Sequence, residues 1–123
     1  MCRTNDRCRA AVIMDAYGQG ANELVRLGLQ KPYLMMTRQA DSGLSAFFNK
    51  ATDAVWFVLS NTEHASFAYG YETTDPSIAN RDLQLTMKAY ILAFFNKYLK
   101  NEDNRLLDGP STNFPRVVSF QKK

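Results

Sequence analysis

The chain has 123 residues, so one domain, or part of one, is the expected size. Hydrophobic residues make up 46% and charged residues 22%, the balance of an ordinary globular protein and not of a disordered one. The net charge is +3, but the basic residues are scattered from Arg3 to Lys123, so no nucleic-acid partner is expected. The longest apolar runs fall far short of the roughly 20 residues that cross a bilayer, and the N-terminal stretch has no apolar signal core. These features predict no membrane span and leave the compartment open.

Two cysteines, Cys2 and Cys8, lie in the polar N-terminal segment. Together with the distant His64 they are too few ligands for a zinc site, so neither a metal nor an organic cofactor is expected. We expect both cysteines to be incidental. A local disulfide between them is the alternative if the protein is exported.

The first predicted element is an unbroken apolar strand over Arg9–Asp15. The run does not alternate with polar residues, which indicates a strand covered on both faces, as in a parallel sheet. A short helix is expected within residues 21–29. A second apolar strand, Tyr33–Thr37, follows Pro32, which a strand tolerates as its first residue.

A second short helix is predicted over Gly43–Ala51, and a third continuous apolar strand over Ala54–Leu59. The connections 16–31 and 38–53 are each longer than the about 10–12 residues that a crossover between parallel strands needs. The spacing therefore predicts three parallel strands with helices between them.

The strongest helical pattern lies in the C-terminal half. Asp75 and Pro76 have the character of a helix N-cap and a first-turn proline. Apolar residues then recur at three- and four-residue steps, at Leu83, Met87, Tyr90, Ile91, Phe94, Phe95 and Tyr98. Beyond Asn101 turn residues are frequent, and Val117–Val118 is predicted as a short extended segment.

This order of elements predicts an α/β fold. A sheet of three parallel strands is small, and its intensely apolar first strand would be an unpaired edge. Because such strands normally lie inside larger sheets, we expect residues 1–123 to form one incomplete domain, the C-terminal part of a larger one. The same edge favours self-association by strand addition.

Polar residues just beyond the predicted strands are the candidates for function, because open parallel sheets bind ligands there. They are Asp15 and Tyr17, Asp41, and Glu63 with His64. A carboxylate and an imidazole on neighbouring strand ends suit the acid–base half of a hydrolytic triad, in which the acid accepts the proton on Nδ1. Each residue also has an ordinary interpretation: His64 as a solvated loop residue, Asp15 as a turn former, Asp41 as a helix N-cap.

Five short stretches occur in an order and spacing that resemble a known family: Asp6–Ala16, Lys31–Met36, Thr62–Phe67, Tyr90–Leu99 and Leu106–Pro110. Together they resemble the C-terminal third of an α/β-hydrolase, most closely the platelet-activating-factor acetylhydrolase and dienelactone hydrolase branches. The resemblance implies a partial α/β-hydrolase fold. It also implies serine-type hydrolysis of a small ester or lipid ester.

The resemblance implies that His64 is the general base and acid. It points to Asp15 as the triad acid in the acetylhydrolase-like branch, and to Asp41 in most other members of the family. We prefer Asp15, since Ile-Met-Asp-Ala matches the acetylhydrolase pattern, and keep Asp41 as the alternative. Tyr17 and Phe67 are expected at the wall of the substrate pocket.

The chain lacks the Gly-x-Ser-x-Gly elbow that presents the nucleophile in this family; Gly43–Phe47 keeps only the first glycine. We therefore expect the chain to carry the acid and the histidine but to be inactive by itself. One alternative is a non-catalytic module that pairs with another chain. Another is a nucleotide-binding module built on Gly18–Glu23, where Glu23 replaces the third glycine and would repel a pyrophosphate.

Overall fold

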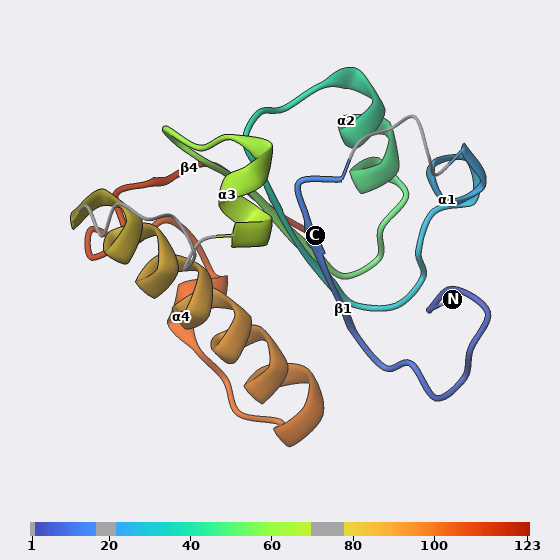
Figure 1. Cartoon of the computed structure of the whole chain (residues 1–123). Helices are drawn as coiled ribbons and strands as arrows, with labels where there is room; N and C mark the ends of the chain where they lie inside the picture. Colours follow the sequence, from blue (N-terminus) through green and yellow to red (C-terminus); the bar gives the residue numbers. More distant parts are fainter. Residues whose placement is uncertain (1, 17–21, 70–77) are drawn as a thin grey trace.

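The computed structural model describes residues 2–16, 22–69 and 78–123 (Figure 1). The elements of this part are, in chain order, β1 (Ala11–Met14), α1 (Asn22–Leu27), β2 (Tyr33–Thr37), α2 (Ser42–Asn49), β3 (Ala54–Leu59), α3 (His64–Tyr69), α4 (Ile78–Lys100), the 3-10 helix η1 (Arg105–Leu107) and β4 (Val117–Lys122). Strands alternate with helices, and the fold is α/β, as the sequence predicts.

The strands of the described residues form one sheet in the order β1-β2-β3-β4. The first three are parallel, with Met14 opposite Met36 and Met36 opposite Phe57, which confirms the predicted topology. β4 runs antiparallel to β3 at the edge away from β1. It reaches Lys122 and is longer than the predicted segment Val117–Val118. The sequence indicates only a short segment because this edge strand is largely exposed and has few apolar residues.

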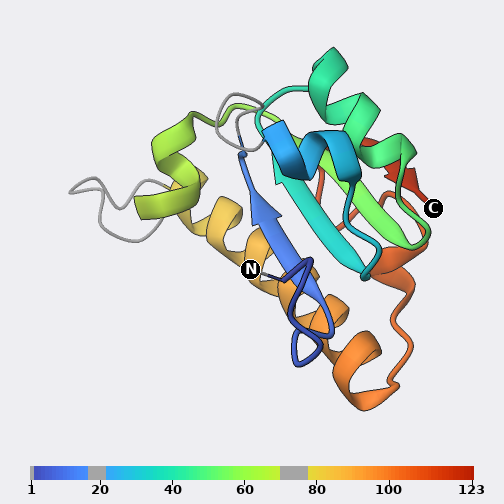
Figure 2. The same ribbon diagram turned by 90° about the vertical axis from the view of Figure 1, so that its right-hand side faces the viewer.

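Helices cover both faces of the sheet, α1 and α2 on one side and α4 on the other (Figure 2). Successive side chains of β2 point to opposite faces, so each face has its own core. On the first face, Tyr33 and Met35 pack with Trp56, Leu44, Phe47 and Phe48. On the second, Leu34 and Met36 pack with Phe57, Leu83, Tyr90 and Phe94. All five residues of β2 are buried, which explains its unbroken apolar run.

The amphipathic pattern of α4 is confirmed. Leu83, Tyr90 and Phe94 are buried, and the remaining predicted positions are partly buried against the same core. Leu85, Leu92 and Leu99 lie on the exposed side of the helix. The predicted cap, Asp75 and Pro76, lies outside the described residues. In the part of the chain that the structure describes, none of the helices combines the length and apolarity that a membrane span requires.

Cys2 and Cys8 form a disulfide, with their Cα atoms 5.2 Å apart, so the expectation that both are incidental is wrong. A turn brings them together: the Cys8 N–H donates to the Asn5 carbonyl at 3.0 Å. The Lys31 ammonium contacts the same carbonyl and ties the loop to the segment before β2. Spacing alone could not establish this bond, because a disulfide requires the two Cβ atoms to approach and a polar segment need not turn back on itself.

Candidate active site

Asp15 lies immediately beyond β1, at the carboxyl end of the parallel strands. Its N–H donates to the Met36 carbonyl at 2.7 Å and so continues the pairing with β2 by one residue. The backbone then turns away with a φ of 42° at Asp15, a left-handed conformation that Asp adopts more readily than most residues. The residue is 4% exposed. The local backbone thus fixes a buried carboxylate at the end of the sheet.

The connection after β3 places His64 as the first residue of α3. The Thr62 hydroxyl donates to the Leu59 carbonyl at 2.7 Å, which closes the turn at the end of the strand. The Ser66 hydroxyl then accepts the N–H of Glu63 at 3.0 Å, and the Ser66 N–H donates to the Glu63 carbonyl at 3.0 Å. The first bond is one half of a capping box, in which the N3 side chain accepts the N-cap N–H, and the two bonds together fix the start of the helix. His64 therefore has a defined position although it follows a loop.

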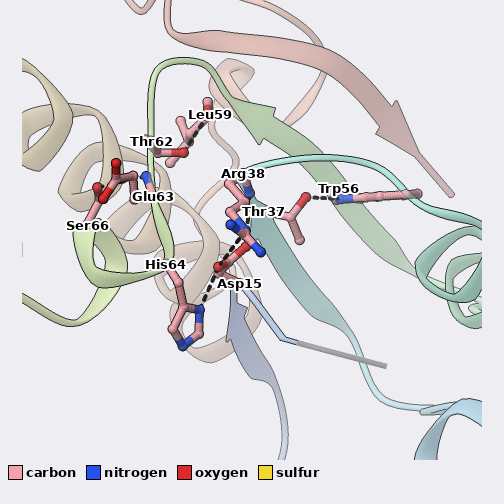
Figure 3. A network of polar contacts seen from close by, with 9 residues as sticks. All are labelled: Asp15, Thr37, Arg38, Trp56, Leu59, Thr62, Glu63, His64 and Ser66. Carbon is pink, nitrogen blue, oxygen red and sulfur yellow. Dashed lines mark hydrogen bonds and ion pairs between the residues drawn. The ribbon is translucent and has the colours of Figure 1, made fainter. Parts of the chain in front are cut away.

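Asp15 and His64 meet at this end of the sheet (Figure 3). His64 Nδ1 lies 2.6 Å from Asp15 Oδ2, with the carboxylate buried and the imidazole side chain 55% exposed. An ionised carboxylate only accepts hydrogen bonds, so it favours the tautomer with the proton on Nδ1 and the lone pair on Nε2. An oriented imidazole of this kind can take up and return a proton at Nε2.

Arg38 is a third member of this site. Its backbone N–H donates to Asp15 Oδ1 at 3.1 Å, and its Nε lies 3.6 Å from Asp15 Oδ2. The sequence does not single it out, because it lies in the connection 38–53 between two predicted strands. Its place directly after Thr37 indicates the correct edge of the sheet, since parallel strands end on the same side, but the contact with Asp15 also depends on the register.

Asp41, the alternative acid, caps α2 instead. Its carboxylate accepts the N–H of Leu44 at 2.8 Å, and its carbonyl accepts the N–H of Ser45 at 3.0 Å. This is the N-cap role that the sequence offers as the ordinary interpretation. The structure thus brings Asp15 to His64 and leaves Asp41 engaged at the start of a helix.

Of the two residues predicted at the pocket wall, Tyr17 and Phe67, the structure describes only Phe67. Tyr17 lies outside the described residues. Phe67 is 7% exposed and belongs to the core cluster that includes Leu83 and Tyr90. Its role at a pocket wall remains a prediction, and its described contacts are those of a core residue.

Other candidate sites have less support. Within residues 2–16, 22–69 and 78–123, no three His, Cys, Asp or Glu side chains are grouped to hold a metal ion. A concavity of about 430 Å³ near the end of α4 is lined by Lys97, Asp103, Asn104, Arg105 and Asp108. Small-molecule pockets are mostly apolar, so this charged surface is not a good candidate. Most of the glycine-bearing stretch before α1 lies outside the described residues, and the nucleotide-binding alternative remains untested.

No protein-family model matches the sequence, and no curated protein is significantly similar to it. Among solved structures, the chain is similar to a ferulic acid esterase from Streptomyces cinnamoneus, with a TM-score of 0.68 and 20% sequence identity. The match covers 98% of this chain and 42% of the esterase, so the chain spans less than half the length of that structure. At this identity the likeness shows the fold. The chain therefore shares its α/β fold with the matching part of that esterase.

Proposed function

We propose that the chain is the part of a serine-type carboxylic ester hydrolase that carries the catalytic acid and histidine. The observation on which the proposal depends is the 2.6 Å contact between His64 Nδ1 and Asp15 Oδ2 at the carboxyl end of a parallel sheet. An acid–imidazole pair does not by itself specify which bond is cleaved. The likeness to an esterase fold favours ester hydrolysis as the reaction class.

In this proposal His64 exchanges protons at Nε2 throughout the reaction. It accepts the hydroxyl proton of the serine as the serine oxygen attacks the ester carbonyl, and it then donates that proton to the leaving alcohol. Water then attacks the acyl-enzyme and gives a proton to Nε2, and Nε2 donates that proton to the serine oxygen as the carboxylic acid leaves. Asp15 remains ionised and stabilises the imidazolium in both steps.

The serine itself is proposed to come from sequence outside these 123 residues, since the chain has no Gly-x-Ser-x-Gly elbow. The substrate is proposed to be a small ester or a lipid ester. An acid directly after β1 favours the acetylhydrolase-like branch, because the other branch would place the acid at Asp41, which caps a helix here.

The decisive experiment compares two proteins: the isolated chain, and a protein in which the chain is joined to a segment bearing the nucleophilic serine. Only the second should hydrolyse short p-nitrophenyl esters and react with a fluorophosphonate probe, and His64→Ala should remove both properties. Gln39→Ala, an exposed substitution just after Arg38, is the matched control and should retain activity. Turnover by the isolated chain, or full activity of His64→Ala, would contradict the proposal.

A second candidate function, a non-catalytic module that pairs through β1, is favoured by one observation. In the described sheet β1 pairs only with β2, and its last residue, Met14, is 44% exposed. The N–H groups of Ala11 and Asp15 point to β2, where they meet the carbonyls of Pro32 and Met36. Strand alternation then directs the N–H of Val12 to the open side.

This geometry gives a selective test of pairing. Val12→Pro removes an outward N–H and preserves the bonds to β2, because proline is tolerated where the missing donor faces away from the sheet. If copies of the chain associate through β1, light scattering should report a dimer that Val12→Pro converts to a monomer. A monomeric wild-type chain would contradict the pairing function.

A further inference from the structure

Asp15 is a buried carboxylate, and such a charge is costly unless partners surround it. The two carboxylate oxygens of Asp15 have different partners. Oδ1 accepts the backbone N–H of Arg38, whereas Oδ2 faces His64 Nδ1 at 2.6 Å and Arg38 Nε at 3.6 Å. Arg38 therefore approaches the carboxylate with both its main chain and its side chain.

The position of Arg38 is fixed by the end of β2. Thr37 accepts a hydrogen bond from Trp56 Nε1 at 2.9 Å, and both residues are buried in the sheet. On the other side of β2, the Met36 carbonyl accepts the N–H of Asp15. β2 is thus bonded to both β1 and β3 up to the residue before Arg38. Figure 3 shows the contact of Trp56 with Thr37 and, one residue further on, the contacts of Asp15 with Arg38 and His64.

We propose that Arg38 is a positioning residue of the hydrolase site, which balances the charge of Asp15 and holds Oδ2 toward His64. The proposal rests on the function proposed above. The guanidinium is farther from Oδ2 than the imidazole is, so it supports the carboxylate without replacing His64 as the short hydrogen-bond partner. Its positive charge also favours the orientation of the carboxylate in which Oδ2 faces His64 and Arg38 Nε.

The test uses the imidazole itself as the probe. The sequence contains one histidine, so the ring ¹⁵N and ¹H signals of the labelled chain belong to His64 without further assignment. The quantity measured is the rate at which the Nδ1 proton exchanges with water, since a well-held hydrogen bond to Asp15 slows that exchange. This readout does not require turnover.

Two neutral variants, Arg38→Gln and Arg38→Met, remove the cation and keep the backbone N–H, so the test does not depend on one substitution folding. We expect the exchange of the Nδ1 proton to become faster by about tenfold in both, and Arg38→Lys to recover most of the loss. Arg105→Gln, at an exposed position of helix η1, is the matched control and should leave the rate unchanged.

Asp15→Asn separates the two proposals. If Asp15→Asn accelerates exchange and the neutral Arg38 variants do not, Arg38 has no positioning role and the proposed function is unaffected. If Asp15→Asn leaves the rate unchanged, the Asp15–His64 bond does not hold the imidazole, and the proposed function fails as well. Acceleration in Asp15→Asn and in the neutral Arg38 variants supports both.

Discussion

Asp15 and His64 are 49 positions apart in the sequence, and their side chains meet at 2.6 Å although their strands are not neighbours. β2 lies between β1 and β3, so the segment that follows β3 must cross the end of β2 to bring the imidazole to the carboxylate. Arg38 occupies that crossing point. The contact between Asp15 and His64 therefore depends on β1, β2 and β3 ending close together at the same edge of the sheet.

The first prediction separates the two candidate acids in a protein that also contains the nucleophilic serine. Asp15→Asn removes the charge that holds the imidazole tautomer and should lower kcat by about 10³–10⁴-fold, with little change in KM. Asp41→Asn should retain most of the activity, because asparagine also caps helices well. Steady-state kinetics on one ester would decide between them. The reverse result would assign the acid to Asp41.

The second prediction concerns the cap of α2. Asp41→Ala leaves the N–H of Leu44 without its side-chain acceptor and should lower the free energy of unfolding by about 1 kcal/mol. Urea denaturation followed by circular dichroism measures the loss. Asp41→Asn, the matched control, should stay close to the wild type; an equal loss in both variants would indicate a role other than capping.

The third prediction concerns the disulfide between Cys2 and Cys8, which closes a short loop. Replacing both cysteines by serine should lower the free energy of unfolding by about 2 kcal/mol, the chain-entropy value for a loop of this size. Thermal melts with and without a thiol reductant give an independent measure. A wild-type chain whose melting temperature is insensitive to the reductant would show that the bond does not stabilise the fold.

The fourth prediction follows from three tyrosines. Burial raises the pKa of Tyr33, of Tyr90 and of Tyr98, and a hydrogen bond to Asp53 adds to the effect at Tyr98. The fold therefore favours the neutral phenol relative to the unfolded chain. The corresponding stability is complete below pH 10 and is lost as the pH rises above that value. Denaturation series from pH 8 upward should show this decline, and Tyr98→Phe should make it shallower.

The fifth prediction tests the bond at the end of β2. Thr37→Val preserves the shape of the side chain but leaves the buried Nε1–H of Trp56 without its acceptor, at a cost of about 1–3 kcal/mol. Trp56→Phe removes the donor together with much packing. A double-mutant cycle should show that the two losses are less than additive, whereas strict additivity would show that the bond contributes nothing.

Most of the strands and the long helix can be predicted from the sequence, because a strand that is buried on both faces appears as an unbroken apolar run. The unbroken run Tyr33–Thr37 predicts the second of three parallel strands, and the periodicity from Leu83 to Tyr98 predicts the long helix. The meeting of Asp15 and His64 follows from one rule, that parallel strands bring their carboxyl ends to the same edge of the sheet.

The features that could not be predicted depend on the register of the strands and on the conformation of turns. Arg38 contacts Asp15 because Met14 is opposite Met36, and apolar patterning does not specify that alignment. The disulfide depends on how a polar loop folds back. β4 is a partly exposed edge strand whose contacts come from Val117 and Phe120, too few apolar positions to distinguish a strand from a short extended segment.

The chain has one tryptophan, and the structure places it where an optical signal is most useful. Trp56 is bonded to Thr37, the residue that precedes Arg38, and has almost no contact with solvent. Its fluorescence emission therefore reports whether the end of β2, which precedes the contact between Arg38 and Asp15, is folded. A red shift on mutation or on heating would reveal that this end of β2 has loosened, in an unlabelled sample and without a substrate.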